Sequence, residues 1–89
     1  MKLSQIGKLI SFIFSYFYGI PLKVFFDEWK DAEIPTWKEK VLRIIVSREY
    51  AELFMNRWKD FLEKIYEYAR SIGAEDVIKK IYIIYEIEG

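Results

Sequence analysis

Residues 47–72, SREYAELFMNRWKDFLEKIYEYARSI, carry the clearest structural pattern in this sequence. Apolar residues recur along the stretch at alternating spacings of three and four, at Ala51, Phe54, Trp58, Phe61, Ile65, Tyr68 and Ile72. That spacing places them on one face of an α-helix. Gly73 follows directly, where a glycine in the left-handed conformation often ends a helix. The stretch therefore predicts a long central helix against which the rest of the chain packs.

Residues 1–20 show the same helical spacing, at Leu3, Ile6, Ile10, Ile13, Phe17 and Ile20. A row of small residues runs beside it, at Gly7, Ser11, Ser15 and Gly19. Small side chains every four residues form a groove in which another helix can approach closely. Pro21 ends the pattern, because proline lacks an N–H and disfavours the helical conformation in the residue before it. We therefore expect a first helix with a close-packing face.

Two shorter segments are also predicted to be helical. Within residues 21–31, one helical face would carry Leu22, Phe25, Phe26 and Trp29. Residues 36–46 begin with Thr36 and Glu39 at the spacing of a capping box, in which each side chain bonds a backbone N–H at the helix start. Apolar residues follow at Trp37, Val41, Leu42, Ile44 and Ile45.

Residues 74–88 fit two structures. Val77, Ile81, Ile84 and Tyr85 can share a helical face, but the run IYIIYEI is β-branched and aromatic and suits a strand equally. With a helix favoured here, the predicted fold is all-α. It is a single domain in which three to five helices form a small bundle around residues 47–72.

Composition limits the class of protein. Hydrophobic residues make up 53 % of the 89 residues and aromatic residues 19 %. A chain this short forms one domain with a small core, so we expect the excess in a dimer interface, a larger complex or a bilayer. This hydrophobicity excludes intrinsic disorder. The abundance of Ile, Lys, Glu and Tyr is typical of hyperthermophile proteins, such as those of archaea or their viruses.

Cysteine and histidine are both absent from the sequence. Their absence excludes a thiol nucleophile, a Ser-His-Asp triad and a zinc site with nitrogen and sulfur ligands. Acid pairs at helical spacing could bind Mg²⁺ through oxygen ligands, at Asp27/Asp31, Glu49/Glu52 and Glu63/Glu67. Nearby Lys and Arg balance each pair, which favours solvated helix faces. We therefore predict no enzymatic activity, no cofactor and no metal site.

The stretch from Gly19 to Phe26 resembles the motif with which proteins bind sliding clamps. In that motif a Gln is followed at fixed spacing by an aliphatic residue and two aromatics. Leu22, Phe25 and Phe26 match the last three positions, and Gly19 stands where the motif has Gln. The resemblance implies a protein partner, whereas the helical pattern favours a core position for the same three side chains.

The leading functional hypothesis is a small non-enzymatic protein-interaction or structural protein, acting as a homodimer or other homo-oligomer or as a subunit of a larger assembly. Such contacts are anchored by buried aromatic side chains. The interaction candidates are Trp29, Trp37, Trp58, Phe25, Phe26 and Leu22. The row Gly7, Ser11, Ser15 and Gly19 is the candidate for close helix packing.

Two alternatives remain open. Residues 1–26 carry basic but no acidic side chains and could anchor a membrane-associated subunit, although the uncharged run 9–22 is shorter than the ~20 residues that a spanning helix needs. A small DNA-binding regulator could use a helix-turn-helix whose phosphate contacts are Arg48, Arg57, Lys59 and Lys64. The net charge of zero gives no basic surplus for that role. The expected location is cytoplasmic, or the membrane through the N-terminal segment.

Overall fold

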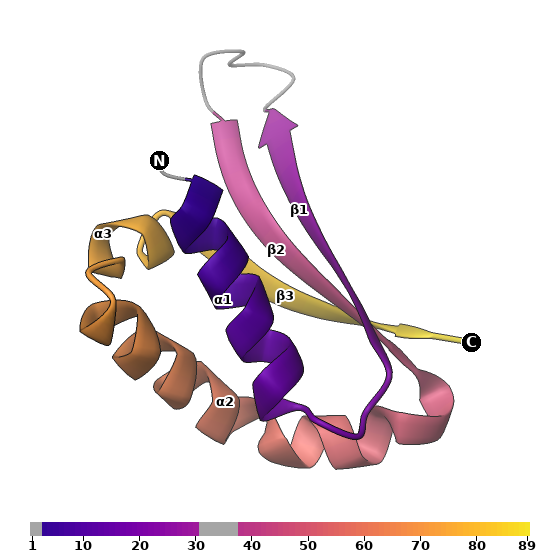
Figure 1. The fold of residues 1–89 in the computed structure, drawn as a ribbon. Helices are drawn as coiled ribbons and strands as arrows, with labels where there is room; N and C mark the ends of the chain where they lie inside the picture. The colour runs from indigo at the N-terminus through magenta and orange to yellow at the C-terminus, as the bar shows by residue number, and fades with distance from the viewer. Residues whose placement is uncertain (1–2, 31–37) are drawn as a thin grey trace.

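The structure is a computed structural model that describes residues 3–30 and 38–89. It contains both strands and helices (Figure 1). The elements in chain order are α1 (Leu3–Tyr16), β1 (Leu22–Lys30), β2 (Lys38–Ser47), the 3₁₀ turn η1 (Arg48–Tyr50), α2 (Ala51–Ser71), α3 (Glu75–Ile78) and β3 (Ile81–Glu88). The fold is therefore mixed α/β, with a three-stranded sheet. The prediction of an all-α bundle is wrong.

The strands lie in the order β1-β2-β3, so β2 is central. β1 and β2 are antiparallel, with Phe26 opposite Leu42. β2 and β3 are parallel, with Leu42 opposite Ile83. Parallel strands need a long crossover, because the chain must return to the end where the first strand began. Here η1, α2 and α3 form that crossover (Figure 1).

The core lies between one face of the sheet and the two long helices. Both helices contribute to it, α1 through Ile6, Leu9, Ile13 and its following residue Phe17, and α2 through Phe54, Phe61, Ile65 and Ala69. The sheet contributes Leu42, Ile44, Val46 and Ile81. Aromatic rings join the layers, with centroids 4.6 Å apart for Phe17 and Phe54 and 4.7 Å apart for Trp58 and Tyr85. Such pairs contribute about 0.5–1.5 kcal/mol beyond area burial.

The predicted helices at 21–31 and 36–46 are the strands β1 and β2. The reason is that β2 carries apolar residues on both faces, as a central strand often does. The resulting doublets, Val41-Leu42 and Ile44-Ile45, have the spacing of a helical face. Their β-branched side chains favour the extended chain, and pairing with two neighbours decides the outcome. Thr36 and Trp37 of the expected capping box lie outside the described residues.

The C-terminal segment contains one helical turn and then a strand. α3 covers only Glu75–Ile78, and β3 follows from Ile81 to Glu88. The favoured helical interpretation of residues 74–88 is wrong for most of the segment, and the strand alternative is confirmed. The strand finds its partner within the chain, because the crossover brings it beside β2.

The central helix and its end are confirmed. α2 spans Ala51–Ser71, and Gly73 has a φ of +74°. The N–H of Ala74 donates to the carbonyl of Ala69 at 2.7 Å, and that of Gly73 to the carbonyl of Arg70 at 3.2 Å. These two bonds form a Schellman motif. α1 ends at Tyr16, earlier than expected, and the chain turns through Gly19 at a φ of +91° before β1.

Candidate interaction surface

The sheet has a second face that the helices leave uncovered, and we call it the open face. Strand alternation and the pairing register assign to it Lys23, Phe25 and Asp27 of β1, Glu39, Val41, Arg43 and Ile45 of β2, and Tyr82, Ile84, Glu86 and Glu88 of β3. None of these side chains belongs to the core cluster or packs against it. α1 and α2 lie on the opposite side of the sheet (Figure 1).

Apolar side chains from all three strands lie on the open face. Phe25 on β1 is 42 % exposed and Tyr82 on β3 is 58 % exposed. Ile45 and Ile84 are half-buried, and Val41 is buried without joining the core cluster. The two exposed aromatics therefore lie on the two edge strands, and the aliphatic side chains of this face are buried or half-buried. Two exposed aromatic side chains on a sheet face that neither long helix covers make this face a candidate for contact with another molecule.

Arg43 lies at the centre of the open face and links the three strands. Its Nε is 3.3 Å from Oδ2 of Asp27 on β1, and its Nη1 is 3.6 Å from Oε1 of Glu86 on β3. The buried Nε forms no hydrogen bond by geometry, so the Asp27 contact is an ion pair alone. The guanidinium also lies over the Phe25 ring, 5.2 Å from its centroid. These contacts hold the cation in one position on the surface.

The described charges of the open face are mostly acidic. Its cations are Lys23 and Arg43, and its carboxylates are Asp27, Glu39, Glu86 and Glu88. A second ion pair joins the edge strands, with Lys23 Nζ 3.5 Å from Glu88 Oε2. The described part of this face is therefore net negative by two, although the whole chain is neutral. A polyanion is a poor match for such a surface.

Shallow hollows lie at both ends of the sheet. One of about 190 Å³ is lined by Pro21, Leu22, Lys23, Ile45, Ser47 and Glu88. The other, of about 340 Å³, is lined by Glu39, Lys79, Lys80, Ile81 and Tyr82. Both combine open-face residues with charged side chains at the rim. A partner that covers the open face would find a recess at either end of the strands.

A third hollow, of about 420 Å³, lies between α1 and α2 and is lined by Phe12, Tyr16, Lys64, Glu67, Tyr68 and Ser71. The Tyr16 hydroxyl donates to Asp60. Burial, followed by this bond and the negative charge of Asp60, raises the pKa of Tyr16 to about 12. The phenol therefore stays protonated near neutral pH and is no candidate base.

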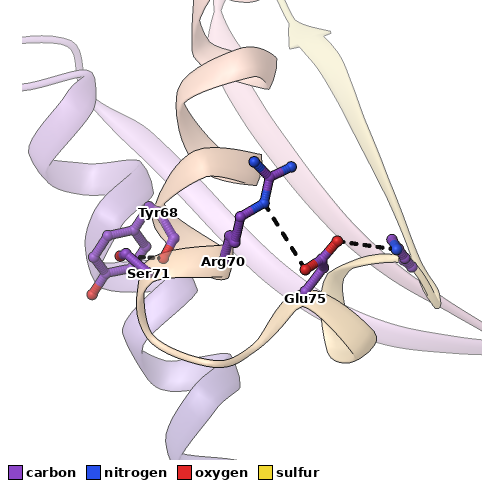
Figure 2. A network of polar contacts seen from close by, with 5 residues as sticks. Tyr68, Arg70, Ser71 and Glu75 are labelled. Atoms are coloured by element: carbon purple, nitrogen blue, oxygen red, sulfur yellow. Dashed lines mark hydrogen bonds and ion pairs between the residues drawn. The ribbon is translucent and has the colours of Figure 1, made fainter.

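Polar contacts at the end of α2 are structural (Figure 2). The Ser71 hydroxyl donates to the Tyr68 carbonyl at 2.7 Å, and the same carbonyl accepts the Ile72 N–H at 3.1 Å. Glu75 on α3 pairs with Arg70 at 3.9 Å and with Lys79 at 3.1 Å. The bond and charge of Lys79 lower the pKa of Glu75 below its usual value. These pairs fasten α3 to the end of α2.

The acid pairs named from the sequence form no metal-binding group among the residues that the structure describes. Asp27 lies on β1 in the ion pair with Arg43, and Asp31 is outside the described residues. The other four carboxylates, Glu49, Glu52, Glu63 and Glu67, are exposed. Among the side chains that the structure describes, residues 4–28 and 39–89, no charged one is buried, and no group of three described residues is suited to bind a metal ion.

The structure separates the predicted interaction residues. Phe25 lies on the open face, whereas Leu22 and Phe26 pack against the core. Trp58 is half-buried on α2 against Phe54, Phe61 and Tyr85. Trp37 and the side chain of Trp29 lie outside what the structure describes. Sequence reasoning missed Arg43, Ile84 and Tyr82, because only the strand register brings Arg43 and Ile84 into one row with Phe25 and Tyr82 into the next row.

The small-residue row of α1 points away from the core. Gly7, Ser11, Ser15 and Gly19 are all exposed, and a Cβ at either glycine would meet nothing within 4 Å. Contact with a helix of another chain stays a prediction. In the described part of the chain no helix has the length and apolarity to cross a bilayer. The phosphate-contact candidates Arg48, Arg57, Lys59 and Lys64 are exposed, and Lys64 lies 3.9 Å from Glu67.

No family model, curated protein or solved structure matches this chain. Function therefore has to be inferred from the open face and from the edges of the sheet that carries it.

Proposed function

We propose that this protein is a small non-enzymatic interaction or structural protein, and that the open face is the surface through which it joins an assembly. The observation that carries this proposal is the exposure of Phe25 and Tyr82 on a sheet face that lacks a helical layer among the described elements. Sheets in stable domains bury their apolar faces against another layer. A partner protein would supply that layer.

The partner that fits is a protein surface with an apolar centre and basic groups at its rim. Phe25, Tyr82 and Ile84 offer the apolar contacts, and the surplus of two negative charges on the described open face favours a basic rim. Arg and aromatic residues are enriched among the residues that dominate binding energy. Arg43 is already held by Asp27 and Glu86, so binding would cost little side-chain entropy at this position.

The membrane alternative has weaker support. The apolar residues of α1 that would enter a bilayer, Ile6, Leu9 and Ile13, are buried in the core. Among the larger apolar side chains near α1, Phe14 and Tyr18 remain exposed. The open face, by contrast, carries the exposed aromatics Phe25 and Tyr82 on a surface that neither long helix covers.

A matched pair of phenylalanines tests the proposal. Phe25 on the open face is 42 % exposed and Phe14 on α1 is 46 % exposed. A photoreactive phenylalanine analogue at each position would cross-link neighbouring molecules in the source cells. We expect a defined protein product from position 25 only. That protein, once purified, should bind the wild-type chain and bind Phe25→Ser at least about tenfold more weakly, with Phe14→Ser unchanged.

Three outcomes would contradict the proposal. One is equal binding by the wild type and Phe25→Ser. Another is an equal loss in Phe25→Ser and Phe14→Ser, which would mean that the open face has no special role. The third is cross-linking at position 25 to lipid or nucleic acid in place of protein.

A further inference from the structure

We propose that two copies of the chain join edge to edge through β3, antiparallel about a two-fold axis at Ile84, into one six-stranded sheet. The inference rests on the proposed function and deepens it, because it names a second copy of the chain as one partner. The observation behind it is the exposed edge of β3 together with the order of charges along that strand. The two copies would merge their open faces into a single surface.

β3 is an edge strand with few of the features that protect an edge. Among the described strands it pairs with β2 alone, so its other side offers backbone N–H and C=O groups. Natural edge strands avoid pairing through charged residues, proline, bulges or short length. β1, the opposite edge, carries Lys23, Asp27, Glu28 and Lys30 along its length. β3 runs for eight residues without proline, and its first five, Ile81–Tyr85, are uncharged.

The charges at the two ends of β3 are complementary to each other. Lys80 comes directly before the strand, and Glu86 and Glu88 lie in its second half. Antiparallel pairing about Ile84 brings Glu88 to Lys80 of the other copy, in the turn just before β3, where the Lys80 N–H bonds the Val77 carbonyl, and it does so twice per dimer. Opposite charges directly across two strands stabilise the pairing, and like charges destabilise it. Parallel pairing would place each glutamate opposite itself.

The same register matches the side chains on both faces. On the core side, Ile81 lies opposite Ile87 and Ile83 opposite Tyr85, which would cover Ile87, 42 % exposed in the single chain. On the open side, Ile84 meets its own copy. Moving the axis to Tyr85 leaves Lys80 without Glu88, and moving it to Ile83 places Glu88 opposite the helical residue Ile78. The axis at Ile84 therefore pairs residues 81–87 of the two strands, with Tyr82 opposite Glu86, and it also brings Glu88 beside Lys80.

The two-fold axis stands perpendicular to the sheet, so it keeps each face on its own side. The helices of both copies lie on one face, and the two open faces become continuous on the other. Phe25 and Arg43 of each copy then belong to one surface of six strands. A partner protein could engage both halves at once, which raises its avidity through effective concentration.

Engineered cysteines test the register, since the natural chain has none. Residues directly opposite in antiparallel strands have Cβ atoms about 4.5–5.5 Å apart, within reach of a disulfide after a small shift. In Ile84→Cys the two thiols meet at the axis. The control is Tyr82→Cys, on the same face. Residue 82 lies opposite residue 86 of the other copy, so the two thiols are four residues, or about 13 Å, apart along the strands. With oxidised glutathione, Ile84→Cys should form a covalent dimer at least about tenfold faster than Tyr82→Cys.

Charge reversal tests the ends of the interface. Light scattering on the wild-type chain should give a dimer, twice 10.8 kDa. All charge variants are made in a Lys23→Met background, which removes the pair of Glu88 within its own chain. Lys80→Glu and Glu88→Lys should each weaken the dimer by about tenfold, and the double variant should restore it, because both pairs per dimer are swapped. Lys8→Glu, on exposed α1, is the control and should leave the dimer unchanged.

The results separate this inference from the proposed function. A wild-type chain that stays monomeric, or equal disulfide rates at positions 82 and 84, would overturn the β3 dimer, even if Phe25→Ser still lost its partner. Failure of the double charge variant to restore the dimer would also overturn it. A β3 dimer whose Phe25→Ser variant binds the cross-linked partner normally would instead overturn the proposed role of the open face.

Discussion

The Nε of Arg43 lies 3.3 Å from Oδ2 of Asp27, and this ion pair joins the central strand β2 to the edge strand β1 on the open face. The same guanidinium reaches Glu86 on β3 at 3.6 Å. One side chain therefore ties all three strands together. It is about one-third exposed, so solvent screens the two pairs only in part.

Removal of this cation should weaken the sheet. Arg43→Met keeps most of the aliphatic stem but leaves Asp27 and Glu86 without their common partner. We expect the free energy of unfolding to fall by about 1 kcal/mol in urea titrations. Lys23→Met is the control, because its pair with Glu88 is largely exposed, and its loss should cost below about 0.5 kcal/mol. Equal losses in both variants would show that Arg43 has no special structural role.

Neighbouring isoleucines of β2 should respond differently to truncation. Ile44 faces the helices and is fully buried, whereas Ile45 is half-buried on the open face. Ile44→Ala should lower the free energy of unfolding by about 2–5 kcal/mol, because it leaves a cavity in the core. Ile45→Ala should cost about 1 kcal/mol, since less surface returns to water. Chemical denaturation of both variants measures the difference. Comparable losses of unfolding free energy would contradict the placement of Ile44 and Ile45 on opposite faces of β2.

That pair also explains why the strands could not be predicted from the sequence. A helix over residues 36–46 places Ile44 and Ile45 on one apolar face, while a strand places them on opposite faces. The second interpretation places Ile45 on a sheet face that neither long helix covers, where it is only half-buried, so the rule that apolar residues are buried favours the helix. The density of β-branched residues from Val41 to Val46 was the signal for a strand.

The central helix was predictable because its pattern is local. α2 has a single apolar face, and Gly73 supplies the end signal within the same stretch. The open face is different, since Phe25, Arg43 and Ile84 come together only through the register of three strands. Phe25 could be named from the sequence as an interaction residue. Its neighbours could not be named, because they are distant along the chain.

Tyr16 should make stability depend on alkaline pH. Its pKa is raised from 10.0 to about 12 in the folded chain, chiefly by burial. A group whose pKa is higher in the folded state contributes stability that is complete below its unfolded pKa, and that contribution is lost as the pH rises through the folded value. Stability should therefore fall between pH 10 and 12 more steeply in the wild type than in Tyr16→Phe. If the melting temperatures of the two proteins fell in parallel between pH 10 and 12, the raised pKa of Tyr16 would be contradicted.

Ser11 tests whether the small-residue row of α1 forms an interface. The sequence pattern predicts a close helix contact, in which Ser11→Leu would cost ~1–3 kcal/mol by overpacking. Ser11 is exposed in the folded chain, on the side away from the core. If copies join through β3, Ser11→Leu should change neither the melting temperature nor the mass in solution. Ile13→Ala, two residues on and fully buried, should unfold at a lower temperature.

A lower mass for Ser11→Leu in light scattering would reverse this conclusion. It would mean that helices of two copies meet along Gly7, Ser11 and Ser15, since nothing within the described chain contacts that row closely at Gly7. The charge variants at Lys80 and Glu88 would then leave the mass unchanged. One experiment with both sets of variants therefore decides whether copies associate through α1 or through β3.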